Sequence, residues 1–168
     1  MHKELKTEIK ELIEDFKLNC SVERFEDEVD WYDISMNQTL SESFIREFQN
    51  KLDWVFISYK QILSESFIRE FQDKVSWNNI SCEQTLSEPF IREFKDKVNW
   101  NYISYYQALS ESFIREFQDK VDWDKLPENQ KYLKKQIQKE KAKTNAKRQE
   151  ILKKVPVPLK NMVNHVFC

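Results

Sequence analysis

Glycine is absent from the 168-residue sequence. Phosphate-cradling loops, dinucleotide fingerprints and nucleophile elbows all need a backbone without Cβ at positive φ or close to a ligand, so none of these sites can be built from this chain. Glycine is also the usual residue of tight β-hairpins and of helix C-caps. Its absence argues against a hairpin-rich protein and favours helices.

Long apolar runs and paired cysteines are missing as well. The longest apolar run is about four residues, Trp54 to Ile57, far short of the roughly 20 that cross a bilayer. Cys20, Cys82 and Cys168 are widely spaced and odd in number, which fits neither a disulfide framework nor a zinc site. Free thiols suit a reducing compartment, and the N-terminus has no apolar segment resembling a signal peptide. We therefore expect an intracellular protein with no membrane association, no metal and no cofactor.

Histidine occurs only at the ends of the chain, as His2 and His165. No Cys-His or Ser-His arrangement then has a base held by a rigid scaffold. Paired catalytic carboxylates would have to face each other within about 10 Å, whereas the repeated acids here are expected in parallel rows on a charged surface. We expect no enzymatic activity and no catalytic residue.

Charge is divided unevenly along the chain. Residues 1–130 hold 16 Lys and Arg against 27 Asp and Glu, a net charge of -11, whereas residues 131–168 hold 11 against 2, a net charge of +9. This asymmetry indicates that the basic tail binds either an anionic partner or an acidic surface of the same or a neighbouring molecule.

Tryptophan recurs every 23 residues, at positions 31, 54, 77, 100 and 123. Alignment on it gives four similar copies and one divergent copy that ends at Gln38. The four read LSESFIREFQNKLDWVFISYKQ from Leu40, LSESFIREFQDKVSWNNISCEQ from Leu63, LSEPFIREFKDKVNWNYISYYQ from Leu86 and LSESFIREFQDKVDWDKLPENQ from Leu109. A fixed period of this length indicates a repeat architecture.

Caps and periodicity predict two short helices in each unit. The serine after the leucine is a preferred N-cap, and apolar residues such as Phe44, Ile45, Phe48 and Leu52 follow at helical spacing. Pro89, in the first turn of one copy, costs little there because first-turn amides have no intrahelical acceptor. The residue before each tryptophan is also a strong N-cap and predicts a second helix of eight or nine residues, as from Trp54 to Gln61. These second caps are Asp30, Asp53, Ser76, Asn99 and Asp122.

Helices of about 8 to 11 residues are marginal alone in water, so the units should exist only by stacking. The sequence thus predicts an all-α fold, an α-solenoid of about five two-helix repeats in residues 21–130. Residues 1–20 are expected to form a capping helix, whose apolar stripe is Leu5, Ile9, Leu12, Ile13 and Phe16. Residues 131–168 are expected to form a long basic helix and a short apolar terminal helix.

The unit LSESFIREFQDKVDWxxISxxQ resembles tandem repeats in proteins of giant DNA viruses, over about residues 24–130. The resemblance implies an α-helical repeat protein of viral or similar origin, made in the infected host cell or carried in the particle. It implies no characterised activity and does not extend to the first half-unit or the basic tail.

Residues that stay constant among the copies are expected to form the scaffold. The phenylalanines, tryptophans and isoleucines should form the core, and the repeated Arg46 and Glu47–Lys51 positions a solvated ion-pair ladder on the first helix. A phosphate-binding arginine row is the alternative. The glutamine that ends each unit should bond to backbone at unit junctions, or else form an amide ladder for a ligand; these are Gln38, Gln61, Gln84, Gln107 and Gln130.

Residues that vary among the copies fall at the first, second, fifth and sixth places after the tryptophan, on one face of the second helix. Aromatic residues exposed on such a face mark an interface. We therefore expect a protein partner to bind there; the alternative is that these side chains fill gaps between units. The candidate residues are Tyr32, Met36, Phe56, Tyr59, Tyr102, Tyr105 and Tyr106.

The basic tail is the second candidate site. A nucleic-acid-associated function is the alternative to protein binding and scaffolding, and it would be non-specific and salt-sensitive, because the helix has no aromatic beyond Tyr132. Two further alternatives for the basic tail are a solvated helix and a helix that lies on an acidic protein surface. Leu159, Met162, Val163, Val166 and Phe167 predict a stripe that docks on the stack, on a second copy as a dimer contact, or in a partner. The candidate cations are Lys134, Lys135, Lys139, Lys141, Lys143, Lys147 and Arg148.

Overall fold

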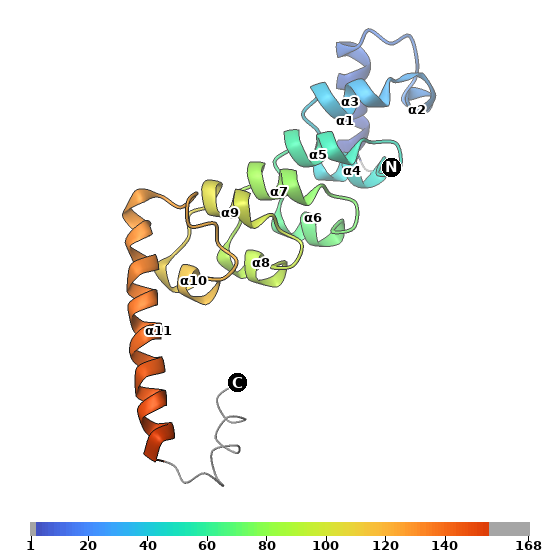
Figure 1. The fold of residues 1–168 in the computed structure, drawn as a ribbon. Helices are drawn as coiled ribbons and strands as arrows, with labels where there is room; N and C mark the ends of the chain where they lie inside the picture. The colour runs from blue at the N-terminus through green and yellow to red at the C-terminus, as the bar shows by residue number, and fades with distance from the viewer. Residues whose placement is uncertain (1–2, 155–168) are drawn as a thin grey trace. The chain divides into compact units, whose positions relative to one another are not determined.

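A computed structural model describes residues 3–154, which hold eleven α-helices and no β-strand (Figure 1). The chain divides into two compact units, one ending at Gln107 and the other beginning at Ala108. The predicted all-α repeat fold is confirmed. The predicted terminal stripe, from Leu159 to Phe167, lies outside the described residues.

The first unit contains nine helices in two rows (Figure 1). The helices that begin at a tryptophan, α3, α5, α7 and α9, form the second row. They pack directly on one another in sequence order, α3 on α5, α5 on α7 and α7 on α9. The bounds are α1 Lys3–Asp15, α2 Phe25–Glu28, α3 Trp31–Asn37, α4 Glu42–Glu47, α5 Trp54–Lys60, α6 Glu65–Glu70, α7 Trp77–Glu83, α8 Glu88–Glu93 and α9 Trp100–Tyr106. The second unit contains α10 (Glu111–Glu116) and α11 (Glu128–Lys154).

The predicted caps start most of these helices. The Oγ of Ser64 accepts a hydrogen bond from the amide of Phe67 at 3.1 Å, and the other three unit-opening serines do the same. The side chain of Asp53 accepts from the amides of Val55 and Phe56, as Asp30 and Asn99 do in their units. Ser76 is the exception, since its side chain makes no cap hydrogen bond to α7.

The repeat helices are shorter than predicted. From α4 to α10, the first helix of each repeat has six residues and the second helix, where present, has seven. The first helix is short because its C-cap is a phenylalanine such as Phe48. A turn follows, in which the Lys51 amide donates to the Phe48 carbonyl. Lys51 therefore lies beyond the helix, and its nearest acid is Glu26, at 3.3 Å, not Glu47. The helices end in extended or near-helical backbone and not in the left-handed region, which explains how a chain without glycine stops them.

One residue in the described part of the chain has positive φ. Lys17, at φ 52°, follows α1, and its amide bonds to the carbonyl of Glu14 while the amide of Leu18 bonds to Ile13. This is the Schellman arrangement, in which glycine is usual.

The terminal repeats are incomplete. In the first, α2 covers only the end of the expected first helix; in the last, residues 123–125 form a turn where a second helix was predicted. Pro127 stands where the earlier units have serine and has no amide to bond the carbonyl of Trp123, so a helix cannot continue through it.

The core repeats with the sequence. Phe44, Phe67 and Phe90 are fully buried, as are the isoleucines that follow them. The tryptophans are half-buried; the Trp54 indole donates to the Gln49 carbonyl at 2.9 Å.

Within the first compact unit, two buried hydrogen-bond ladders join successive 23-residue repeats. The Gln84 amide donates to the Gln61 carbonyl at 2.8 Å and accepts from the Leu63 amide at 3.0 Å, and Gln61 and Gln107 repeat this pattern. This confirms backbone bonding at repeat junctions for Gln61, Gln84 and Gln107, whereas Gln130 donates to the Leu109 carbonyl at 2.8 Å within its own repeat and the Gln38 side chain does not take part in the pattern. A second ladder uses serine: the fully buried Ser58 Oγ donates to the Trp54 carbonyl at 2.6 Å and accepts from the Ser76 amide at 2.9 Å.

Helix α1 takes the place of a preceding first helix. The Glu8 carboxylate accepts from the amide of Ser41 at 2.9 Å and from its Oγ at 2.6 Å. Within the array Glu42 accepts from the Ser64 amide at 2.8 Å in the same way. Of the stripe predicted for this helix, Leu5, Ile9 and Leu12 are buried, whereas Ile13 is half-buried and Phe16 is half-buried beyond the end of α1.

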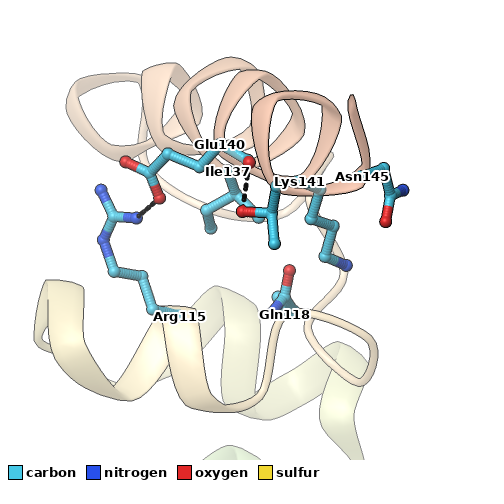
Figure 2. A pocket seen from close by; sticks show the side chains of 7 residues that line it. Arg115, Gln118, Ile137, Glu140, Lys141 and Asn145 are labelled. Atoms are coloured by element: carbon cyan, nitrogen blue, oxygen red, sulfur yellow. Dashed lines mark hydrogen bonds and ion pairs between the residues drawn. The ribbon is translucent and has the colours of Figure 1, made fainter. Parts of the chain in front are cut away.

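In the second unit, α11 imitates a following repeat against α10. Ile137 lies 23 residues after Ile114 and is buried, and Arg115 contacts Glu140 at 2.9 Å as Arg46 contacts Glu70 at 2.8 Å (Figure 2). These contacts show that α11 covers the apolar face of α10.

Candidate protein-interaction surface on the second helices

The surface that varies among the copies is a continuous face of the α3, α5, α7 and α9 row, here called the second-helix face. It comprises the first, second, fifth and sixth residues after Trp31, Trp54, Trp77 and Trp100. In an α-helix these positions span an arc of about 140°. The third and fourth positions, isoleucine and serine, are buried on the opposite side.

Large apolar side chains are exposed on this face. Exposed fractions run from 37% for Tyr102 to 59% for Tyr32 and Tyr105, and Phe56 and Met36 are half-buried. The remaining exposed members are Val55, Tyr59 and Tyr106. The predicted tyrosines therefore lie at the surface, whereas Phe56 is half-buried and contacts Tyr32 between α3 and α5.

The aromatic residues form two clusters. Tyr32 of α3 meets Phe56 of α5 edge to face, with ring centroids 5.2 Å apart. Val55 and Tyr59 also lie on α5. We call these four residues the first cluster.

The second cluster lies on α9 and consists of Tyr102, Tyr105 and Tyr106. The rings of Tyr105 and Tyr106 are 4.7 Å apart and nearly perpendicular, and those of Tyr102 and Tyr106 are 6.1 Å apart. These tyrosines contact one another while their outer surfaces remain accessible to solvent.

Helix α7 separates the two clusters with a polar segment. The Asn79 side chain donates to the Val55 main-chain carbonyl at 3.0 Å, and the Asn99 side chain donates to the side-chain Oδ1 of Asn78 at 2.8 Å. Cys82 and Glu83 complete it, with the Cys82 thiol 3.1 Å from the Glu83 carboxylate. The face is thus apolar at both ends and hydrogen-bonding in the middle.

Cys82 is not an activated nucleophile. Desolvation, with added effects from the Glu83 carboxylate, raises the pKa of the thiol above its ordinary value. The neighbouring Cys82 raises the pKa of Tyr106 in turn. Both groups are therefore neutral at physiological pH, which suits a binding face better than a reactive site.

Some exposed or structurally important residues were not singled out from the sequence. Val55, which the sequence places on the variable face but not in the candidate set, is 57% exposed, and Ile62 is 98% exposed at a junction where other copies have Thr39, Thr85 or Ala108. The signal for Ile62 was its replacement of small or polar residues. The buried serines were also missed, although the pair Ile-Ser recurs in four units.

The candidate cations of α11 fall into two groups. Lys134 lies over the Trp123 ring at 6.0 Å, Lys141 is 3.6 Å from Asp119, and Arg148 is half-buried. The other four, Lys135, Lys139, Lys143 and Lys147, are exposed.

The arginine row is engaged with acids. Arg46 pairs with Glu42 at 3.5 Å and Glu70 at 2.8 Å, and Arg69 repeats both contacts. The predicted ion-pair ladder is therefore present for the arginines, although the predicted Glu47–Lys51 pair is not part of it. The guanidinium groups are already paired with carboxylates and are poorly disposed to receive phosphates.

Among residues 3–154, no group of histidine, cysteine, aspartate and glutamate side chains is arranged to hold a metal ion. Within the same range, no helix combines the length and the apolar composition that a membrane span requires. Comparison with protein-family models, curated proteins and solved structures finds no match to this chain.

Proposed function

We propose that the protein is a non-enzymatic binding and scaffolding module that holds a protein partner on its second-helix face. The observation that carries this proposal is the pair of exposed aromatic clusters on helices joined by buried hydrogen-bond ladders. Tyrosine on a rigid support offers large contact area with little conformational entropy to lose, as is typical of residues that dominate binding energy.

The spacing of the clusters supports a particular kind of partner. Adjacent packed helices lie about 8 to 10 Å apart, so α5 and α9 are separated by about 16 to 20 Å. A partner segment with two apolar anchors at that separation and a polar middle would match both clusters and the amides of α7. Such a segment fits in an amphipathic helix of three to four turns, roughly 11 to 13 residues.

The cellular setting of this partner is part of the proposal. The resemblance of the repeat to tandem-repeat proteins of giant DNA viruses supports a partner in the infected host cell or in the virus particle. Cys20 and Cys82 are free thiols, which is consistent with a reducing intracellular compartment.

The test is affinity capture by the full chain from the cell that makes it, with mass spectrometry and titration of the partner recovered. Replacing Tyr59, Tyr102 and Tyr105 together by serine should weaken that partner's binding at least about 30-fold, since the loss of even one hot-spot residue costs about 2 kcal/mol or more. Tyr132→Ser is the matched control, because Tyr132 is 49% exposed on α11 and outside the face. Unchanged affinity of the triple variant, with an unchanged circular dichroism spectrum, would contradict the proposal.

A further inference from the structure

Helix α11 carries a regular row of lysines at positions 131, 135, 139, 143 and 147. Residues four apart on an α-helix form one ridge, with successive members about 6 Å apart along the axis. Lys131 pairs with Glu128. We call the other four, Lys135, Lys139, Lys143 and Lys147, the lysine ridge.

The lysine ridge is free of acidic partners in the described part of the chain. All four side chains are exposed, and none has an ion pair with residues 3–154. The two acids of residues 131–154 do not neutralise the charge of the lysine ridge. Glu140 pairs with Arg115 at 2.9 Å, and Glu150 lies beyond Lys147, the last lysine of the ridge.

The packed side of α11 is a different surface. Leu133 and Ile137 are buried there, with Lys141 near Asp119 and Lys134 over Trp123. The contacts that fix α11 against α10 therefore leave the ridge available to a ligand.

We propose that the lysine ridge binds the phosphate backbone of double-stranded DNA, as a second activity independent of the second-helix face. From Lys135 to Lys147 it covers about 18 Å, the axial rise of about five base pairs, with evenly spaced positive charges. The major groove of B-DNA admits an α-helix, so α11 can lie along it with lysines reaching the flanking phosphates.

Other polyanions match this surface less well. Protein interfaces are depleted in lysine and need a buried apolar centre, which the ridge does not have. Single strands are held by stacking on aromatic side chains, and residues 133–154 contain none. Duplex RNA has a deep, narrow major groove that side chains cannot read. Evenly spaced lysines without base-reading side chains predict sequence-independent binding.

The test measures binding of the full chain to a random-sequence DNA duplex of about 20 base pairs by fluorescence anisotropy. Four phosphate contacts predict that log K falls with log salt with a slope of about -3.6 between about 50 and 200 mM salt. The variant K139Q/K143Q/K147Q should reduce the magnitude of this slope by about 2.7 and weaken binding more than tenfold at about 50 mM salt. Glutamine is a good helix former, and circular dichroism should confirm that α11 persists.

The matched control is K3Q/K6Q/K10Q, which removes the same charge from three exposed lysines of α1. It should leave the slope and the affinity nearly unchanged, as should serine at Tyr59, Tyr102 and Tyr105. Equal weakening by both lysine triples, no binding by the wild type, or tighter binding to duplex RNA, single strands or polyglutamate would each overturn the proposal.

Discussion

At the residue scale, a fully buried serine in each of α3, α5 and α7 joins two successive repeats with a single hydroxyl. Ser58 donates to the carbonyl one turn before it and accepts from the amide of Ser76, which opens the next second helix. Ser35 and Ser81 make the same pair of bonds with Asp53 and Asn99. The hydroxyl thereby satisfies an amide that would otherwise be buried without a partner.

Replacing Ser58 by alanine should therefore destabilise the protein by about 1 to 3 kcal/mol, the cost of leaving a buried donor unsatisfied. Urea denaturation measures this loss. Ser66→Ala is the matched control: Ser66 is exposed and occupies the position of Pro89 in the next copy, so its loss should change stability by less than about 0.5 kcal/mol. Equal effects of the two substitutions would contradict a structural role for the Ser58 hydroxyl.

Cys82 gives a chemical readout of the second-helix face. Desolvation and the adjacent Glu83 raise the pKa of its thiol, so less thiolate is present at a given pH and alkylation is slowed. In a chain with Cys20 and Cys168 replaced by serine, Glu83→Gln should lower the pKa of Cys82 and speed its reaction with iodoacetamide near pH 8. Glu47→Gln, on a first helix, is the control and should leave the rate unchanged. A rate unaffected by Glu83→Gln would show that the carboxylate has no influence on the thiol.

Sequence reasoning worked well where one residue type has one local role. N-cap serines and aspartates act on amides two or three positions ahead, and the glutamines recur at every junction, so both could be predicted. The serine ladder could not, because its acceptor and donor are brought together only by stacking. The two-cluster division of the face likewise depends on neighbouring helices, since Tyr32 meets Phe56 from the next unit.

At the element scale, each repeat helix is too short to be stable alone and depends on its caps and neighbours. The lengths were overestimated from the sequence because apolar periodicity continues through Phe48 and Leu52, although the backbone turns there. Phe48 and Leu52 are both buried, so the apolar pattern predicted burial correctly but predicted too long a helix.

Among α3, α5, α7 and α9, only α7 lacks a side-chain cap hydrogen bond, and it offers a direct test. Ser76→Asp should place a carboxylate where Asp53 holds two amides of α5, and should stabilise the protein by about 1 kcal/mol through the cap bonds and the helix dipole. The matched reverse substitution, Asp53→Ser, should lose a similar amount. Thermal and urea unfolding distinguish these outcomes; a destabilised Ser76→Asp protein would argue against capping as the determinant of where second helices begin.

At the scale of the whole molecule, each of the two compact units contains a helix that takes the place of a missing repeat. Glu8 of α1 substitutes for a preceding unit, and Ile137 and Glu140 of α11 substitute for a following one within its own unit. The sequence predicted caps at both ends from the need to cover apolar surface. The specific mimicry could not be predicted, because neither cap shares the repeat sequence.

A repeat array should gain stability with each added unit, because stability is roughly a sum of units and interfaces. Inserting a second copy of residues 63–85 after Thr85 should raise both the melting temperature and the urea m-value, since more surface is buried on folding. An insert with serine at the counterparts of Phe67, Ile68 and Ile80 is the control and should give no such gain. A fall in stability with the intact insert would mean that the units do not stack interchangeably.

The second-helix face is most directly tested by hydroxyl-radical footprinting of the complex between the full chain and its captured protein partner. Binding there predicts strong protection of Tyr59, Tyr102 and Tyr105 relative to the free chain, with Tyr132 on α11 oxidised at an unchanged rate. Unprotected tyrosines on α5 and α9 in a fully occupied complex would contradict the account.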